Sequence, residues 1–115
     1  MINDLIGKYL DVWNERDGAA RDVLIKDVLT GDSVYSDPDY AGLRGHGELS
    51  EAIGRAQEKF GDLVFTLGTL IGAHHDTALF TWRLGAPGSD TPVATGYDVV
   101  EFEGDRIRRV VGFFD

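Results

Sequence analysis

The spacing of apolar residues changes once along the chain, near Gly61. Before this point apolar residues recur every three or four positions, which is the spacing of a helix buried on one side. After it they alternate, which is the spacing of strands with one buried face. Helices gathered first and strands last predict an α+β fold in which helices cover one face of a sheet. A length of 115 residues predicts one domain, 1–115, with one core.

Three helices are expected before Gly61. The first begins at Ile2 and ends near residues 14–18, and the others cover about 18–29 and 48–60. Asp17 has the side chain of a helix N-cap, so it is expected to cap the second helix. The apolar stripe of that second helix consists of Ala20, Val23, Leu24 and Val28.

The segment between the second and third helices contains many turn-forming residues. Residues 33–36 are expected to be a short extended piece, because Pro38 keeps Asp37 out of helical geometry. The segment 41–47, AGLRGHG, is expected to be a glycine-rich loop without a phosphate-binding pattern.

Four long strands are expected beyond Gly61. They cover residues 62–72, 77–85, 93–102 and 107–114. Short turns join them, so the sheet is predicted to be a mostly antiparallel meander. If such a sheet curves strongly over an amphipathic helix, it encloses a cone, and the mouth of the cone is a natural pocket for a small molecule.

Charge and composition exclude several kinds of partner. The net charge of −9 repels phosphate backbones, so nucleic acid is not an expected partner. No apolar run reaches the roughly 18 residues of a membrane span, and the N-terminus lacks a signal-peptide pattern, so a cytoplasmic location is expected. Without cysteine there is no disulfide or thiol chemistry. The run His74–Asp76 is interpreted as a hairpin turn, so neither a metal nor a cofactor is expected.

One strand places a carboxylate among apolar residues. In TGYDVVEF, Asp98 shares a predicted face with Val100 and Phe102. Burial penalises an ionised carboxylate and raises its pKa, which would let Asp98 exchange a proton near neutral pH. The structural alternative is a carboxylate satisfied by helix N–H groups or by an arginine such as Arg109 or Arg44.

Two further residues complete a candidate acid/base site. Tyr9 lies on the stripe of the first helix, and Asp37 precedes Pro38. In the predicted architecture both can point into the same cone as Asp98. A buried phenol can donate a hydrogen bond to an oxyanion, and a carboxylate can remove a proton beside a carbonyl. The plainer alternatives are a core tyrosine and a turn aspartate.

The expected ligand is a small hydrophobic compound that contains a carbonyl group. Apolar side chains expected to contact it are Trp13, Phe65, Phe80, Trp82, Val100 and Phe113. The aromatic members of this set are large enough to fill the cone instead. A filled cone would exclude such a ligand.

Several segments together resemble a known superfamily. These are KYLDVWNERD, SVYSDP, RGHGEL, GYDVVEFEGDRI and RRVVGFFD. In order and spacing they are similar to the nuclear-transport-factor-2-like (NTF2-like) superfamily, and most similar to its SnoaL-like polyketide cyclase branch. The resemblance implies a cone-shaped α+β barrel, with three N-terminal helices packed on a curved sheet, and a homodimer formed through that sheet.

The resemblance also implies roles for the three candidate residues. Ketosteroid isomerase is a member of the superfamily. By resemblance to it, Tyr9 of this chain would match the phenol that donates to the oxyanion, Asp37 the general base and Asp98 the second oxyanion donor. In SnoaL-like cyclases a single aspartate at the position of Asp98 is the acid/base group.

Two functional hypotheses follow. The first is a cofactor-independent acid/base enzyme, either an isomerase or an aldol-type cyclase, with Asp98 as its principal group, assisted by Asp37 and Tyr9. The second is a non-catalytic module for ligand binding or dimerisation, with Val99, Val111 and Phe113 on its sheet face. Fold alone does not decide between them. A cavity beside Asp98 would favour the enzyme.

Overall fold

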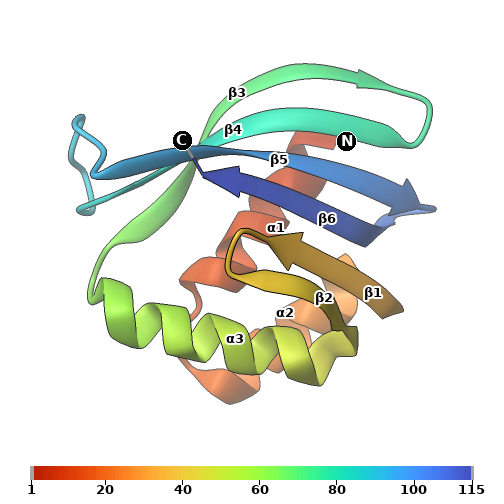
Figure 1. Ribbon diagram of the computed structural model, residues 1–115, viewed down its shortest axis with the longest axis horizontal. Coiled ribbons are helices and arrows are strands. Elements are labelled where there is room, and N and C mark those ends of the chain that lie inside the picture. Colours follow the sequence, from red (N-terminus) through yellow and green to blue (C-terminus); the bar gives the residue numbers. More distant parts are fainter. Residues whose placement is uncertain (1, 115) are drawn as a thin grey trace.

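The computed structural model describes residues 2–114 and contains three helices and a six-stranded sheet in that range (Figure 1). The helices are α1 (Ile2–Asn14), α2 (Gly18–Val28) and α3 (Gly45–Phe60). The strands are β1 (Leu29–Asp37), β2 (Tyr40–Arg44), β3 (Val64–His74), β4 (Thr77–Gly85), β5 (Ala94–Glu103) and β6 (Arg106–Phe114). The predicted α+β class is confirmed, and no helix among these residues is long and apolar enough to cross a membrane.

The sheet has the strand order β2-β1-β6-β5-β4-β3. The four long strands β3 to β6 form the predicted antiparallel meander. β1 joins this meander by pairing in parallel with β6, and β2 continues the sheet beyond β1. The sheet therefore remains open, with β2 and β3 at its edges, instead of closing into a barrel. It bends over the helices, and register irregularities in β3 are of the kind that bends a strand (Figure 1).

The predicted glycine-rich loop at 41–47 is wrong, because residues 41–44 belong to strand β2 and residues 45–47 to the start of α3. β2 pairs antiparallel with β1, where Val34 faces Arg44 and Tyr35 faces Leu43. This pairing uses the hydrogen-bonding groups along an edge of β1. Gly42 has φ +74°, so it supplies a left-handed conformation within the strand that other residues rarely adopt.

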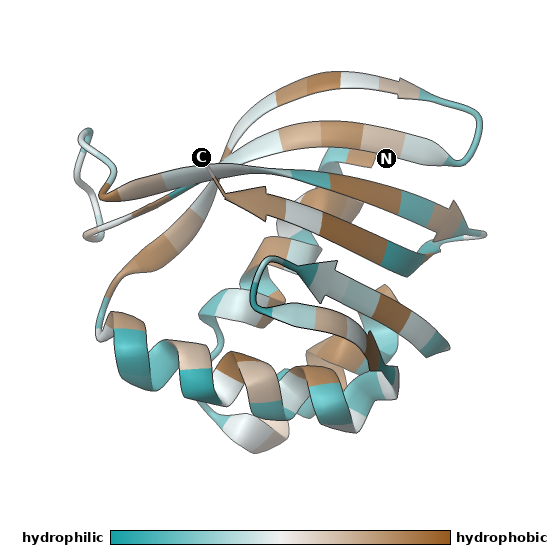
Figure 2. Ribbon diagram, in the orientation of Figure 1, coloured by the Kyte–Doolittle hydropathy of each residue, from teal (hydrophilic) through white to brown (hydrophobic). Residues whose placement is uncertain are grey.

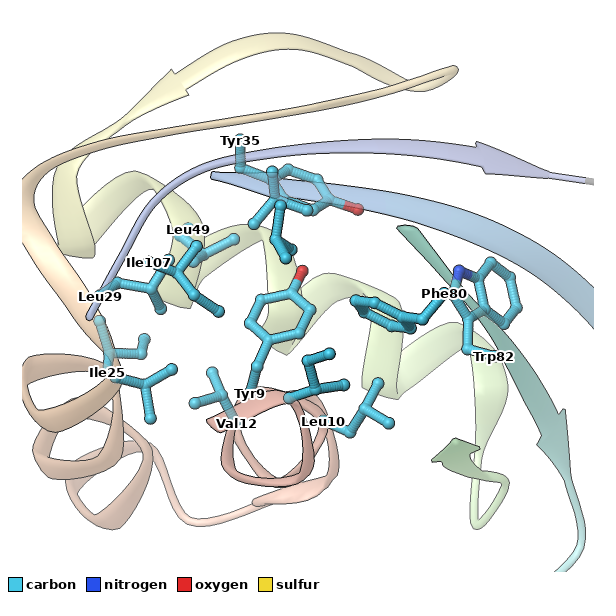
Figure 3. Packing of buried hydrophobic residues seen from close by; sticks show 14 of the residues in the cluster. Tyr9, Leu10, Val12, Ile25, Leu29, Tyr35, Leu49, Phe80, Trp82 and Ile107 are labelled. Carbon is cyan, nitrogen blue, oxygen red and sulfur yellow. The ribbon is translucent and has the colours of Figure 1, made fainter. Parts of the chain in front are cut away.

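The core lies between the helices and the concave side of the sheet. α1 packs against β3, while α3 packs against β1 and β2. Hydrophobic and hydrophilic residues alternate along the strands, as Figure 2 shows, and the inner residues of β4 and β5 are buried. Figure 3 shows Tyr9 rising from α1 into the middle of this core, below Tyr35.

α2 buries only part of the predicted stripe: Val28 is fully buried and Leu24 packs against the core, but the buried face is turned away from Val23. Val23 is 61% exposed, whereas Arg21 is 7% exposed and Ile25 is buried. The reason is a hydrogen-bond network that satisfies the buried guanidinium. Arg21 donates to the Ser50 hydroxyl at 3.1 Å and, at 3.0 Å each, to the backbone carbonyl of Glu15 and the side-chain oxygen of Gln57. A charged side chain that joins α2 to α3 and to the segment after α1 thus occupies the inner face. The prediction for Asp17 is confirmed, since its side chain caps α2 by accepting from the N–H of Ala20.

Candidate active site

A cavity of about 510 Å³ opens between α1, α3 and the concave side of the sheet. Tyr9 enters it from α1, Asp37 from the end of β1 and Asp98 from the middle of β5. These side chains come from three separate segments, and the fold brings them together in the lining of one cavity. Their catalytic roles stay predictions.

Asp98 is 6% exposed and sits on the inner face of β5. Burial raises the pKa of Asp98 to about 7, and the nearby negative charge of Asp37 adds to the increase, while the Trp82 indole N–H works against it. Near neutral pH this carboxyl group can therefore both hold and release a proton.

The arginine alternative for Asp98 finds no support within residues 2–114. Arg44 and Arg109 are both exposed, and Arg109 lies opposite Glu101 in the register between β5 and β6. The ion pairs formed by described residues join Arg55 to Glu51 and Arg108 to Glu101, and neither pair includes Asp98. The Asp98 carboxyl group is thus left without a cation to neutralise it in the described part of the chain.

The Tyr9 hydroxyl is buried and oriented. The indole N–H of Trp13 donates to its oxygen at 2.9 Å. Burial raises the pKa of Tyr9 well above its usual value, and the negative charges of Asp98 and Asp37 raise it further, so the phenol remains protonated. Because this hydrogen bond uses a lone pair of the oxygen, the O–H hydrogen of Tyr9 is available to donate to a ligand.

Asp37 is held more tightly than Asp98. The hydroxyl of Tyr35 donates to its Oδ2 at 2.6 Å. The backbone N–H groups of Asp39 and Tyr40 donate to its Oδ1 at 2.8 Å and 3.0 Å. Three short hydrogen bonds of this kind suit an ionised carboxylate. They also occupy both oxygens of the side chain expected to act as an assisting base.

Comparison with known proteins gives the family. The model of the SnoaL-like domain matches residues 6–110, which is most of the chain. The chain belongs to the SnoaL-like family. No curated protein sequence matches it at a significant level.

Solved structures agree with this assignment. A candidate isomerase of the SnoaL-like family from Agrobacterium tumefaciens is 34% identical, with a TM-score of 0.87 over 97% of this chain and 95% of the other. A candidate polyketide cyclase from Sinorhizobium meliloti is 19% identical, with a TM-score of 0.72 over 95% and 93%. A protein with a ketosteroid isomerase-like fold from Catenulispora acidiphila, in complex with trimethylamine, is 16% identical, with a TM-score of 0.76 over 96% and 85%. The last two similarities concern the fold alone.

In this SnoaL-like chain, three of the six expected ligand-contacting residues line the cavity: Trp13, Phe65 and Trp82. Phe80 and Val100 are fully buried in the core and do not line it. Phe113 is 52% exposed on the outer face of the sheet. The inner position next to it belongs to Phe114, which lines the cavity.

The register of β6 explains the position of Phe113. Gly112 lies opposite Asp98 and faces inward, so the next residue faces outward and Phe114 faces inward again. The inner position expected for Phe113 as a ligand contact is therefore one residue out of phase, whereas its outer position beside Val99 and Val111, expected for the non-catalytic module, is confirmed.

Several cavity residues were not identified from the sequence. They are Tyr35, Tyr40, Phe60 and Phe114 among the aromatic side chains, and Asp39, Arg55 and Lys59 among the charged ones. Tyr35 had a usable signal, since it lies two residues before Asp37 in an extended segment and so shares its face. Nothing in the sequence distinguishes Arg55 or Lys59 from the other exposed charges of a helix.

Histidine does not contribute to the cavity. His46 hydrogen-bonds through Nε2 to the carbonyl oxygens of Leu29 and Thr30, which ties the start of α3 to β1. His74 and His75 lie at the turn between β3 and β4. Among residues 2–114, no group of three or more side chains is placed to hold a metal ion.

Proposed function

We propose that this SnoaL-like protein is a cofactor-independent acid/base enzyme that acts on a small hydrophobic carbonyl compound, as an isomerase or an aldol-type cyclase. The observation that carries the proposal is the pairing of a buried, unneutralised carboxyl group, Asp98, with the buried phenol of Tyr9 at one largely aromatic cavity. This combination supplies a proton acceptor and an oxyanion donor at the same cavity.

The proposed reaction begins with ionised Asp98. Its carboxylate removes a proton from the carbon beside the substrate carbonyl, and the bonding electrons move to the carbonyl oxygen to form an enolate. The O–H of Tyr9 donates a hydrogen bond to that oxygen, where negative charge develops. In an isomerase, Asp98 returns the proton to another carbon. In a cyclase, the enolate carbon instead adds to a second carbonyl of the same molecule, and Asp98 gives its proton to the resulting alkoxide.

The related proteins support this chemistry in general terms. Two of them are named as a candidate isomerase and a candidate polyketide cyclase. A third protein of this fold is in complex with trimethylamine, which supports a cavity for small organic molecules.

The test is proton exchange at the carbon beside a carbonyl. Small aromatic ketones and 1,3-diketones are incubated in D₂O with the protein, and the loss of the exchanging signal is followed by ¹H NMR. Asp98→Asn is expected to slow catalysed exchange by about 10²- to 10⁴-fold. Asp105→Asn, in the exposed turn before β6, is the charge-matched control and should exchange like the wild type.

Equal rates for Asp98→Asn and the wild type would contradict the proposal. Ligands that bind in the cavity without any exchange would favour the non-catalytic binding module instead.

We also propose that two copies pair through the outer face of the sheet. Val99 and Val111 face each other across β5 and β6, and the neighbouring pair Tyr97 and Phe113 is exposed. A second copy would cover this apolar surface. Light scattering should give a dimer for the wild type and a monomer for Phe113→Glu. A monomeric wild-type protein would contradict the pairing.

A further inference from the structure

Asp37 and Asp98 lie in one row across the sheet with a glycine between them. On the parallel side of β6, Ser36 is the partner of Val111, so Asp37 falls beside Gly112. On the antiparallel side, Gly112 is the partner of Asp98. The row crosses the three strands β1, β6 and β5, and its central residue has no side chain.

The space above Gly112 is occupied by the Asp98 carboxylate. A Cβ atom added to Gly112 would lie 2.9 Å from Oδ1 of Asp98 and 3.4 Å from Cβ of Asp37. Carbon and oxygen atoms pack at larger separations than the first of these distances. The Asp98 carboxylate therefore leans over the β6 backbone toward β1, into a space that exists only because residue 112 is glycine.

The position of Asp37 is fixed from the other side. The Tyr35 hydroxyl and two backbone N–H groups hold its carboxylate in place at the start of the turn between β1 and β2. Tyr35 is itself 6% exposed, so its ring is anchored in the core. Asp37 is thus a negative charge with little freedom to move away from Asp98 or toward a ligand.

Other titratable or charged groups also face the same cavity. They are Tyr9 from α1, Asp39 and Tyr40 from the turn and β2, and Arg55 and Lys59 from α3. Asp39, Arg55 and Lys59 are exposed to solvent, which screens their charges. Asp37 is therefore the fixed carboxylate nearest to Asp98 along the sheet.

We infer that Tyr35 and Gly112 are positioning residues that make Asp37 an electrostatic neighbour of Asp98 instead of a second base. A fixed negative charge disfavours ionisation of the neighbouring carboxyl group, so Asp98 keeps its proton to a higher pH. The catalytic meaning of this arrangement rests on the proposed function, but the coupling between the two carboxylates does not.

The coupling is tested by ¹³C NMR on protein labelled at the aspartate carboxyl carbons. The pH titration of Asp98 is assigned by its absence in Asp98→Asn. Asp37→Asn removes the charge and is expected to lower the pKa of Asp98. Tyr35→Phe removes one hydrogen bond that holds the Asp37 carboxylate in place, and it is expected to lower the pKa of Asp98 by a smaller amount.

Two substitutions serve as matched controls for these variants. Asp32→Asn removes an exposed charge from the same strand, β1, and Tyr97→Phe removes a hydroxyl from the outer face of β5. Both should leave the Asp98 titration unchanged. If Asp37→Asn also leaves it unchanged, the inference is wrong.

The role of Gly112 is tested by combining substitutions. Gly112→Ala is expected to push the two carboxylates apart, so that adding Asp37→Asn changes the pKa of Asp98 less than it does in the wild type. Gly72→Ala in β3 is the control, because an added Cβ there would meet no atom within 4 Å. If Asp37→Asn changes the pKa of Asp98 as much in the Gly112→Ala background as in the wild type, Gly112 does not position the two carboxylates. If Gly112→Ala fails to fold, the Asp98 titration in Tyr35→Phe still tests whether the Tyr35 hydroxyl holds the Asp37 carboxylate near Asp98.

Activity separates this inference from the proposed function. In an active enzyme, Gly112→Ala is expected to lower kcat by about 10²-fold, as a displacement of about 1 Å does at other sites. If Asp98→Asn abolishes turnover while Asp37→Asn leaves the pKa of Asp98 unchanged, the inference fails and the proposed function stands. If no substrate exchanges, the NMR titration still tests the coupling by itself.

Discussion

Replacing Asp98 with asparagine is expected to stabilise the folded protein above neutral pH. The asparagine side chain has nearly the same shape as aspartate but carries no charge at any pH. Asp98 is 6% exposed, and no described ion pair neutralises it. At high pH the wild-type protein must therefore keep an ionised carboxylate in an apolar wall, and the variant need not.

The magnitude follows from the pKa of Asp98, which burial raises from 3.8 to about 7. Between these two values the folded protein holds the proton and the unfolded chain has lost it. Because the folded state binds more protons, the free energy of unfolding falls as pH rises through this range. Each tenfold change in proton affinity corresponds to about 1.36 kcal/mol, so the wild type loses up to about 4 kcal/mol that the variant retains.

Urea denaturation at about pH 4 and about pH 8 measures this difference. The two proteins should unfold at similar urea concentrations at the lower pH, and the variant should be clearly more stable at the higher pH. Asp105→Asn controls for the loss of one negative charge from a protein of net charge −9. If the stability difference between Asp98→Asn and the wild type is the same at both pH values, Asp98 does not have a raised pKa and the reasoning is refuted.

Three further substitutions test other contacts. Tyr9→Phe removes the proposed oxyanion donor and should lower kcat by about 10²- to 10³-fold in the proton-exchange assay, so a wild-type kcat would exclude Tyr9 from the reaction. Asn14→Ala removes a side chain that donates to the carbonyl of Phe65 at 2.9 Å and accepts from its N–H at 2.8 Å. It should lower the free energy of unfolding by about 1–3 kcal/mol, whereas Asn3→Ala at an exposed position of the same helix should change it little. Arg21→Met should lower the free energy of unfolding by a similar roughly 1–3 kcal/mol in urea denaturation, because it removes the hydrogen bonds that Arg21 donates to the partly buried Glu15 carbonyl and Gln57 side-chain oxygen, and a stability equal to the wild type would show that these hydrogen bonds contribute nothing.

Local periodicity predicted most of the secondary structure. The strand expected at 77–85 is β4 at Thr77–Gly85, and the first helix is α1 at Ile2–Asn14. Both follow from the spacing of apolar side chains, every three or four residues in the helix and every second residue in the strand, which a sequence displays directly. Alternation also predicted the inner face for Asp98, because β5 is long and one of its faces is buried.

Glycine- and turn-rich segments carry a weaker signal of secondary structure. The segment 41–47 was expected to be a loop, yet its first part pairs with β1 as β2. Its glycines and polar residues fit a loop and a short edge strand equally well. The difference depends on whether a partner strand lies alongside, and the partner is chosen by the fold.

The sequence alone determined the order of the three helices and the four long strands, and the face of Asp98. Only the tertiary structure decided that β1 pairs in parallel with β6, and this pairing places Asp37 beside Gly112 and opposite Asp98. It also decided between the two positions expected for Phe113, because Phe114 and not Phe113 lines the cavity. Side-chain alternation is a local property, whereas the register between strands far apart in sequence depends on how the whole sheet packs over its helices.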